Sequence, residues 1–259
     1  MIDLHSHLLP GLDDGPPDLA GSLAMARAAV GAGTATMAAT PHIDHTQGVD
    51  PRAVRSAVEA LSAELAAEGI ALDVIAGGEV ALTRLPELSD EDLAAVCLGG
   101  GRWILLECPL DPAGGPLEEA VFSLQVRGFD VLLAHPERSP AFLRQPERMR
   151  GLVDQGARTS ITAGALGGRF GRGAQALAFR FLEEGLVHSV ASDSHDARRR
   201  PPGLLEGLAA AESHLPGLEQ LTTWLTREVP GAIATGATLP RMPEVAIRRG
   251  LLSRLKLRR

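Results

Sequence analysis

The chain has 259 residues, of which 45% are hydrophobic and only 3% aromatic, so one sizeable core must rely on Ala, Leu and Val. Its formal net charge of -7 argues against general nucleic-acid binding, because phosphate contacts need Lys and Arg. The only lysine is Lys256, which argues against Schiff-base chemistry, a Walker-type phosphate loop and metal sites bridged by a modified lysine.

Short apolar runs, bounded by Gly, Pro or polar residues, recur at a spacing of roughly 30 residues, the size of one strand–helix–strand unit. They predict seven strands, near residues 1–5, 36–40, 72–76, 103–106, 131–134, 158–162 and 187–192.

Helices are expected between these strands. One starts at Asp50, an N-cap followed by proline, and ends at Gly69. Ser89 and Asp92 resemble a capping box at the start of another. Further helices are predicted near residues 18–33, 117–128, 147–156 and 174–185, each ending at a glycine.

Regular alternation of strands and helices predicts an α/β fold with parallel strands joined by right-handed crossovers. The pattern fits an open doubly wound sheet and a closed barrel equally well. The chain has no linker and no internal repeat of roughly 20–50 residues, so we expect a single domain over residues 1–259.

A basic tail over about residues 241–259 carries seven basic residues and one acid, Glu244. Its leucines give it a partly amphipathic pattern. This pattern fits a solvated final helix, and it also fits a contact with an acidic partner or anionic lipid.

The location is predicted from what the sequence lacks. The first residues, MIDLHSHLLPG, include no basic region followed by an apolar run, which argues against a signal peptide. No stretch of about 18 apolar residues is present, so we expect no membrane span. The two cysteines, Cys97 and Cys108, do not indicate a disulfide framework. Together these observations predict a cytoplasmic protein.

His, Asp or Glu side chains follow six of the seven predicted strands, where the functional residues of parallel α/β folds gather. In chain order they are His5, His7, His42, Glu79, Glu107, His135, Asp193 and His195. Taken alone, His42 or His135 is also compatible with a structural histidine, and Glu79 with a surface acid. Together they predict a metal centre at one end of the strands.

The ligand types restrict the ions. Mixed imidazole and carboxylate ligands suit Mn²⁺, Fe²⁺ and Zn²⁺, and Mg²⁺ is also compatible, whereas the absence of thiolates argues against a closed structural zinc site. The set exceeds what one cation needs, so we expect two or three ions, with Glu79 as the candidate bridge. Such a centre activates water and neutralises charge at a phosphorus atom.

Arginines near these ligands fit the recognition of phosphate, because a guanidinium forms paired hydrogen bonds with phosphate oxygens. Arg138 lies three residues after His135, and Arg200 precedes two prolines. Arg198 and Arg199 are equally compatible with a solvated run. Asp14 fits a third ion site, but a turn residue in Asp-Asp-Gly-Pro is equally compatible with it.

Several motifs carry a resemblance to a known family. The opening Met-Ile-Asp-Leu-His-Ser-His, Asp-Asp-Gly-Pro at 13–16 and Thr-Pro-His at 40–42 resemble the polymerase-and-histidinol-phosphatase (PHP) superfamily. More closely, the chain is similar to bacterial manganese-dependent protein-tyrosine phosphatases of capsule and exopolysaccharide operons. The likeness continues through Gly-Glu at 78–79, Leu-Glu at 106–107, His-Pro-Glu-Arg at 135–138 and Ser-Asp-Ser-His at 192–195.

The resemblance implies a distorted (β/α)₇ TIM-like barrel with Mn²⁺ as the cofactor. It implies three ion sites, formed by His5, His7, Glu79 and Asp193, by Glu79, Glu107 and His135, and by Asp14, His42 and His195. It also makes Arg138 and Arg200 phosphate-binding and, with Asp193, catalytic. The implied substrate is a phosphotyrosine protein, the tail of a tyrosine kinase that regulates polysaccharide synthesis.

The chain departs from the family pattern in its basic tail and in one internal segment. Residues 160–164 read Ser-Ile-Thr-Ala-Gly, where relatives tend to carry a polar, Asn-rich segment, and this changes the expected pocket wall but no proposed ligand.

Two other functions are compatible with the motifs. One is a small-molecule phosphate monoesterase such as a histidinol-phosphatase, and the other is a non-catalytic, metal-stabilised binding module. The sequence leaves the oligomeric state open.

Overall fold

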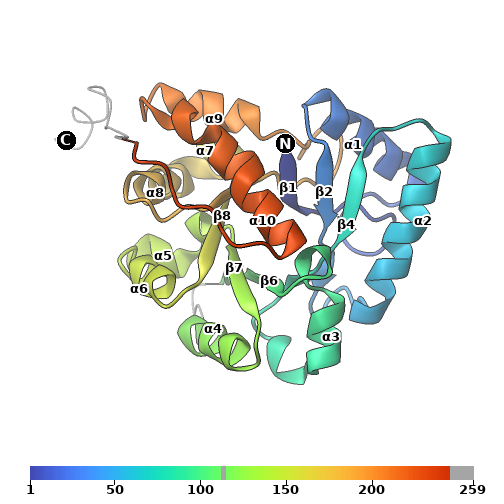
Figure 1. The fold of residues 1–259 in the computed structure, drawn as a ribbon, viewed down its shortest axis with the longest axis horizontal. Coiled ribbons are helices and arrows are strands. Elements are labelled where there is room, and N and C mark those ends of the chain that lie inside the picture. Colours follow the sequence, from blue (N-terminus) through green and yellow to red (C-terminus); the bar gives the residue numbers. More distant parts are fainter. Residues whose placement is uncertain (112–114, 246–259) are drawn as a thin grey trace.

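The computed structural model describes residues 1–111 and 115–245, in which strands and helices alternate (Figure 1). The strands are β1 (Ile2–Ser6), β2 (Thr36–Ala39), β3 (His42–Ile43), β4 (Asp73–Ala76), β5 (Glu79–Val80), β6 (Trp103–Glu107), β7 (Asp130–Ala134), β8 (Arg158–Thr162) and β9 (Ser189–Ala191). The α-helices are α1 (Leu19–Gly31), α2 (Val54–Ala67), α3 (Asp90–Ala95), α4 (Leu117–Val126), α5 (Pro140–Arg144), α6 (Arg148–Asp154), α7 (Ala163–Leu166), α8 (Gly171–Glu183), α9 (Leu205–Glu212) and α10 (Val229–Thr235).

All seven predicted strands are confirmed, as β1, β2, β4, β6, β7, β8 and β9. The short strands β3 and β5 were not predicted. They resume β2 and β4 after two-residue breaks. The second break contains Gly78, where a Cβ would lie 2.8 Å from Val96 Cβ and 2.9 Å from Ile43 Cγ1. Glycine is therefore needed for the chain to pass this point and bring Glu79 beside His42, its partner in the β3–β5 pair.

The strands form two parallel sheets, in the orders β1-β2-β4 and β3-β5-β6-β7-β8-β9. The chain passes from β4, the edge strand of the first sheet, into β5 of the second sheet, so the second sheet continues the strand order of the first. Its far end returns to β1 through an isolated parallel bridge between Ser6 and Ser194. Asp193 N donates to His5 O and His7 N donates to Ser194 O, both over 2.9 Å. We call this contact the β1–β9 seam. The strand order is that of a barrel with seven strand positions.

A buried carboxylate supports the β1–β9 seam from within. Asp3 Oδ1 accepts hydrogen bonds from Ser192 N at 3.0 Å and from His5 N at 3.3 Å. Burial raises the pKa of Asp3 to about 6, although these hydrogen bonds act in the opposite direction. The side chain thus connects the first strand to the segment that follows the last.

The predicted helices are confirmed, and their ends have the expected local chemistry. Ser89 and Asp92 form the capping box of α3. A 3₁₀ turn over Pro51–Ala53, capped by the Asp50 side chain, leads into α2. The buried side of α2 consists of Val54, Val58, Leu61 and Leu65, a spacing that places them on one face of a helix.

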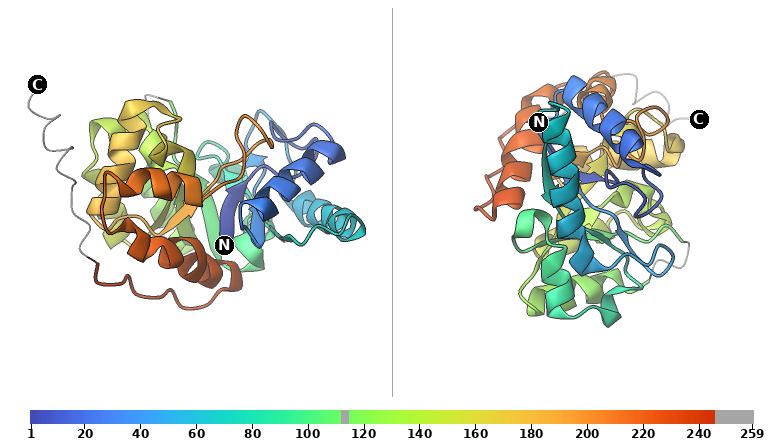
Figure 2. Two further views of the ribbon diagram at one scale, coloured as in Figure 1. Left: turned by 90° about the horizontal axis from the view of Figure 1, so that it is seen from above. Right: turned by 90° about the vertical axis from the view of Figure 1, so that its right-hand side faces the viewer.

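Helices surround the strands (Figure 1). Apolar side chains of the strands and of the helices form the core. The fully buried residues include Leu105 and Leu106 of β6 and Leu132 and Leu133 of β7. Figure 2, in the view from above, shows the loops after β1 and β9 at the edge opposite the N-terminus. The carboxyl ends of these strands therefore face away from α10 and Met1.

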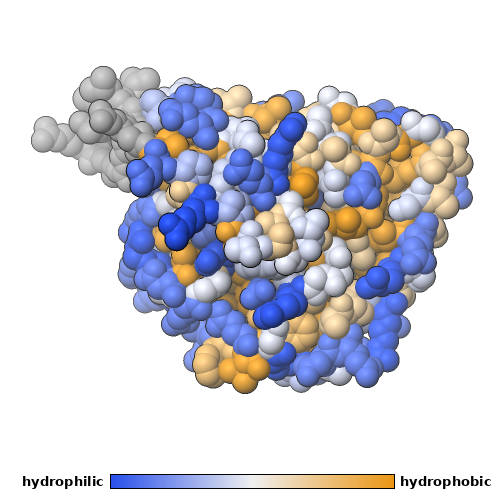
Figure 3. Space-filling model, in the orientation of Figure 1, coloured by the Kyte–Doolittle hydropathy of each residue, from blue (hydrophilic) through white to orange (hydrophobic). Residues whose placement is uncertain are grey.

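Figure 3 shows the face that α10 crosses, with hydrophilic residues on the side of α5 and α6 and apolar residues gathered on the side of β4 and α2. Within the described ranges, no helix combines the length and apolar character that crossing a bilayer requires. Residues 246–259 of the predicted basic tail lie outside the described residues. The described part of the tail, residues 241–245, contains no helix.

Candidate metal centre

Glu79 lies at the middle of a group of histidines from three parts of the fold. Its Oε2 atom is 3.2 Å from His5 Nε2, 3.4 Å from His7 Nε2 and 3.1 Å from His42 Nδ1. Its Oε1 atom is 2.7 Å from His135 Nε2. The Glu79 side chain is 1% exposed. A buried carboxylate surrounded by imidazole nitrogens is the arrangement expected of a residue that bridges cations.

Asp193 connects this group to two arginines. Its Oδ1 atom is 3.6 Å from His5 Nε2 and 3.5 Å from His7 Nε2. Its Oδ2 atom accepts hydrogen bonds from Arg138 Nη1 at 2.5 Å and Arg200 Nη2 at 2.6 Å. One face of the carboxylate thus points to the histidines and the other holds two guanidinium groups side by side.

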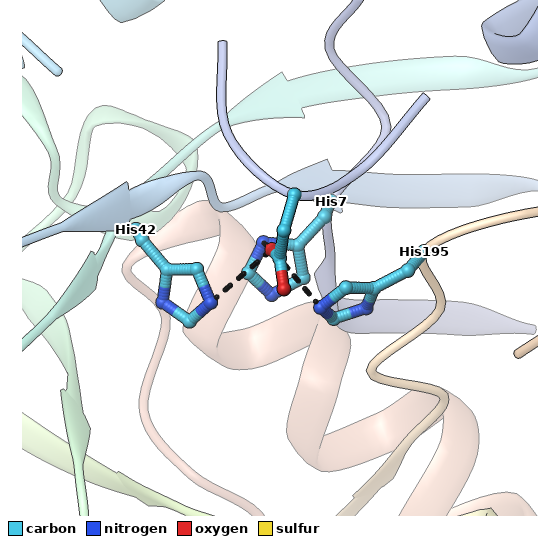
Figure 4. Close-up of side chains that lie close together, drawn as sticks. His7, His42 and His195 are labelled. Atoms are coloured by element: carbon cyan, nitrogen blue, oxygen red, sulfur yellow. Dashed lines mark ion pairs between the residues drawn. The ribbon is translucent and has the colours of Figure 1, made fainter. Parts of the chain in front are cut away.

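A third group forms where the loop after β1 meets the segment after β9. Asp14 Oδ1 lies 3.4 Å from His42 Nε2, 3.3 Å from His195 Nε2 and 3.9 Å from His7 Nδ1. Figure 4 shows the rings of His7, His42 and His195 converging on one point from three segments. The Asp14 side chain is 51% exposed, so this end of the centre opens to solvent.

Each of the nine residues predicted as ligands therefore lies in one connected centre. Four sets have ligand atoms within 4.8 Å of one another: His7, Asp14, His42 and His195; His5, His7 and Asp193; His5, Glu79 and His135; and His42, Glu79 and Glu107. Glu107 groups with Glu79 and His42, whereas the family resemblance pairs it with Glu79 and His135. How the ligands are shared among ions stays a prediction.

The donor atoms of the centre fit divalent cations. Of the ten buried side-chain atoms in the described ranges that make no hydrogen bond, four belong to proposed ligands, namely Nε2 of His5, Nε2 of His7, Oε2 of Glu79 and Nδ1 of His135. Buried polar atoms in proteins almost always have a partner, so this concentration in one place is informative. Imidazole nitrogens and carboxylate oxygens turned toward one another form a mixed ligand set that suits first-row divalent ions.

The electrostatics of the centre favour the ligating forms of Glu79, Asp193 and His195, whereas adjacent carboxylates raise the pKa of His7 and His42 in spite of their burial. Burial by itself raises the pKa of Glu79, but the adjacent histidines outweigh it, so that the pKa lies well below its usual range. The pKa of Asp193 is also lowered, because His5 and His7 outweigh the effect of burial. Burial, followed by repulsion from the positive charges of His7 and Arg200, lowers the pKa of His195 to about 4, which keeps the imidazole neutral.

Glu107 differs from the other two carboxylates. Burial and then the negative charge of Glu79 raise its pKa to about 7. A cation placed between Glu107 and Glu79 would remove this repulsion.

The backbone adopts the left-handed region at two of these positions. His135 has φ of 35° and Asp193 has φ of 50°, and no other non-glycine residue of the described ranges has positive φ. Such conformations cost of order 1–3 kcal/mol and occur where a side chain must be directed to a site. Backbone hydrogen bonds of 2.9 Å, from His135 N to Ser160 O and from Asp193 N to His5 O, hold both turns.

Asp13 is a residue whose role the sequence did not reveal. Its Oδ2 atom lies 2.6 Å from His7 Nδ1 and accepts a hydrogen bond from His42 N at 3.1 Å. Its side chain is 0% exposed, in contrast to that of Asp14. Asp13 therefore orients two ligands. The Asp-Asp-Gly-Pro motif signalled two acids in one loop, but not which of them is buried.

We expect Asp13→Asn to weaken Mn²⁺ binding by roughly 10- to 100-fold, because a partner that orients a ligating histidine typically contributes this much. Competition with a calibrated chelator measures the affinity. Asp44→Asn is the matched control, since Asp44 likewise accepts backbone N–H bonds in a loop, from Thr46 and Gln47. Equal affinities of Asp13→Asn and the wild type would contradict the role of Asp13.

Two further residues at this end of the fold had no role assigned to them from the sequence, although Glu137 belongs to the His-Pro-Glu-Arg motif. Glu137 is fully buried, and its Oε1 atom accepts a hydrogen bond from Thr162 N at 2.8 Å, which joins the ends of β7 and β8. Burial raises the pKa of Glu137 to about 7. The Phe170 ring lies under Arg138, with 4.3 Å from Arg138 Cζ to the ring centroid.

The three consecutive arginines behave differently. Arg200 reaches Asp193, as described above. Arg198 and Arg199 are exposed, and their backbone N–H groups donate to Asp196 Oδ1. For these two the solvated interpretation fits the structure.

Comparison with known proteins places this centre in a known context. Residues 1–229 match the family described as "Capsular polysaccharide synthesis, CpsB/CapC". The chain is 40% identical over 206 residues to tyrosine-protein phosphatase YwqE of Bacillus subtilis, an overlap of 77% of this chain and 79% of YwqE. It is 29% identical over 220 residues to tyrosine-protein phosphatase CpsB of Streptococcus agalactiae, covering 80% and 87% of the two chains.

Solved structures agree with the sequence relatives. The fold matches a chain from the crystal structures of YwqE from Bacillus subtilis and CpsB from Streptococcus pneumoniae, described as unique metal-dependent tyrosine phosphatases. The TM-score is 0.81 at 34% sequence identity, and the match covers 96% of this chain and 99% of the other.

Proposed function

Because this chain belongs to the CpsB/CapC family of capsular polysaccharide synthesis, we propose that it is a metal-dependent phosphatase that hydrolyses phosphotyrosine on proteins. The observation that carries the proposal is the convergence of His5, Glu79 and Asp193 beside two arginines, in a fold that matches metal-dependent tyrosine phosphatases along almost its whole length. The clustered His, Asp and Glu ligand atoms support the proposal that the activity requires a divalent cation.

We propose that the ligands divide among three cations, as the family resemblance implies. One set is His5, His7, Glu79 and Asp193, the second is Glu79, Glu107 and His135, and the third is Asp14, His42 and His195. Cations held there would supply an activated water for attack on phosphorus and would neutralise charge on the phosphoryl oxygens. The proposed ion is Mn²⁺, and Fe²⁺, Zn²⁺ and Mg²⁺ are the alternatives to compare.

The arginines bind and orient the phosphate in this proposal. Arg138 and Arg200 both donate to Asp193 Oδ2, so their guanidinium groups are held next to each other. Each keeps further N–H donors for phosphate oxygens. Holding the phosphate in a fixed orientation beside the centre removes much of the entropic cost of reaching the transition state.

The physiological substrate proposed here is a tyrosine-phosphorylated kinase that regulates capsule or exopolysaccharide synthesis. The family description supports the link to capsule synthesis. The cytoplasmic location and the choice of kinase stay predictions, and so does the absence of nucleic-acid binding.

The test compares hydrolysis of a phosphotyrosine peptide with that of histidinol phosphate, by the same Mn²⁺-loaded protein. We expect a clear preference for the peptide in kcat/KM, loss of activity on removal of metal by chelation, and recovery on addition of Mn²⁺. Preference for histidinol phosphate would instead favour the small-molecule phosphatase. Activity that survives complete metal removal would contradict the metal-dependent mechanism. Elemental analysis gives the number of ions.

A further inference from the structure

A cavity of about 350 Å³ lies beside the metal centre, between the turn after β8 and the segment that joins β9 to α9. Ser192 and Arg200 line it on the side of the centre. Arg200 also donates to Asp193 Oδ2, so the cavity begins where one of the two arginines reaches the metal centre. A substrate bound through phosphate at this arginine has room to extend directly into the cavity.

Much of the lining carries little or no side chain. It includes Gly164, Gly167, Gly203, Gly207 and Ala163. At Gly207 a Cβ would lie 2.2 Å from Ala163 O, so glycine is needed for α9 to lie against α7. At Gly203 a Cβ would have only Glu206 Oε2 nearby, at 3.9 Å, so the space there is open. The departure from the family pattern at residues 160–164 ends in this lining.

An aromatic side chain forms one wall. Phe170 lines the cavity and lies 4.3 Å from Arg138 Cζ. Arg138 is bound in turn to Asp193 at 2.5 Å. Of the two arginines held by Asp193, Arg200 therefore lines the cavity, and Arg138 contacts Phe170, which forms one of its walls. The outer part of the lining includes the exposed residues Arg169 and Glu206, which leave the cavity open to the surface.

We propose that this cavity binds the aryl ring of the phosphotyrosyl side chain. The inference rests on the proposed function and assigns to it the group that distinguishes tyrosine from serine and threonine. A phosphate held by Arg138 and Arg200 places its ester oxygen at the cavity mouth. The glycines of the lining leave room for a planar ring beside Phe170, and aromatic rings pack favourably in offset or edge-to-face contact.

A second cavity is the alternative position for the ring. It has a volume of about 360 Å³, lies beside Glu107 and is lined by Leu82, Pro86 and Leu110. It is more apolar, but neither Arg138 nor Arg200 lines it. A ring bound there would leave the side of the centre that carries the arginines, so the glycine-lined cavity is favoured.

The experiment measures competitive inhibition of the Mn²⁺-loaded protein by benzylphosphonate, ethylphosphonate and inorganic phosphate. Benzylphosphonate mimics the ring and phosphate together, and the other two lack the ring. We expect the wild type to bind benzylphosphonate more tightly than ethylphosphonate. Gly203→Leu fills the cavity and should reduce this preference roughly tenfold or more, as expected for the loss of a buried ring contact. Its inhibition constant for inorganic phosphate should be unchanged.

Phe170→Ala is the second variant, which enlarges the cavity instead of filling it and should also reduce the preference. Gly151→Leu is the matched control, because Gly151 is exposed on α6 with no other atom within 4 Å of an added Cβ. Leu110→Ala tests the alternative cavity.

Four results would overturn the inference: no benzyl preference in the wild type, a preference that survives in both cavity variants, an equal change in phosphate inhibition, or loss of the preference in Leu110→Ala alone. Failure of the wild type to hydrolyse phosphotyrosine peptide is a separate result, which refutes the proposed function itself. Wild-type hydrolysis combined with unaltered preference in the variants refutes only the aryl site.

Discussion

Replacing Asp193 by alanine is expected to lower kcat/KM for a phosphotyrosine peptide by roughly a thousandfold or more, the scale of losing a preorganised charged group at the reacting centre. Asp193 lies within 3.6 Å of two histidine nitrogens and accepts hydrogen bonds from Arg138 and Arg200. Its loss removes a candidate cation ligand. It also frees two guanidinium groups that the carboxylate holds in place.

Steady-state kinetics with added Mn²⁺, together with circular dichroism and thermal unfolding, measure this effect. Asp130→Ala is the matched control, because Asp130 starts β7 at the opposite end of the strands and pairs only loosely with Arg102, at 3.7 Å. If Asp193→Ala keeps activity within a few-fold of the wild type while the control does the same, Asp193 is not part of the site.

Glu79→Gln should cause the second large effect, a loss of bound metal. The Glu79 carboxylate faces four histidines at distances between 2.7 and 3.4 Å. Its lowered pKa keeps it ionised, so glutamine of nearly the same size removes a negative charge that cations need. We expect the variant to retain at least one ion fewer per chain after dialysis, and its kcat to fall by roughly a thousandfold.

Elemental analysis of the dialysed proteins gives the ion count, and kinetics at saturating Mn²⁺ give kcat. Glu118→Gln serves as control, since Glu118 is paired with Arg148 at 2.6 Å and belongs to none of the candidate metal groups. Full metal content in Glu79→Gln would exclude Glu79 as a bridging ligand.

Much of the site could be anticipated because the carboxyl ends of parallel strands meet at one end of the fold. Once the strand near residues 103–106 is recognised, Glu107 must lie at that end, and the same holds for His135 and Asp193. The short strands β3 and β5 were not predicted because two residues are too few to show the alternation of apolar and polar side chains that indicates a strand. Consequently His42 and Glu79 were expected to follow their strands, whereas each begins a new one.

Contacts between distant segments could not be anticipated. Asp3 and Ser192 are 189 positions apart in sequence, and no local pattern reports their hydrogen bond. The choice between Asp13 and Asp14 depends on which carboxylate is buried, which depends on how the loop after β1 packs against His7. The contact of Phe170 with Arg138 likewise arises from the packing of α8, and its sequence neighbours gave no sign of it.

The β1–β9 seam joins the first ligands to be synthesised to the last. His5 and His7 leave the ribosome early, whereas Asp193 and His195 lie 188 positions further along the chain. At typical translation speeds this interval is roughly ten to forty seconds, during which the nascent polypeptide holds only part of the ligand set. The backbone hydrogen bonds of the seam and the full ligand set both require the segment after β9, so a chain truncated before β9 should be inactive.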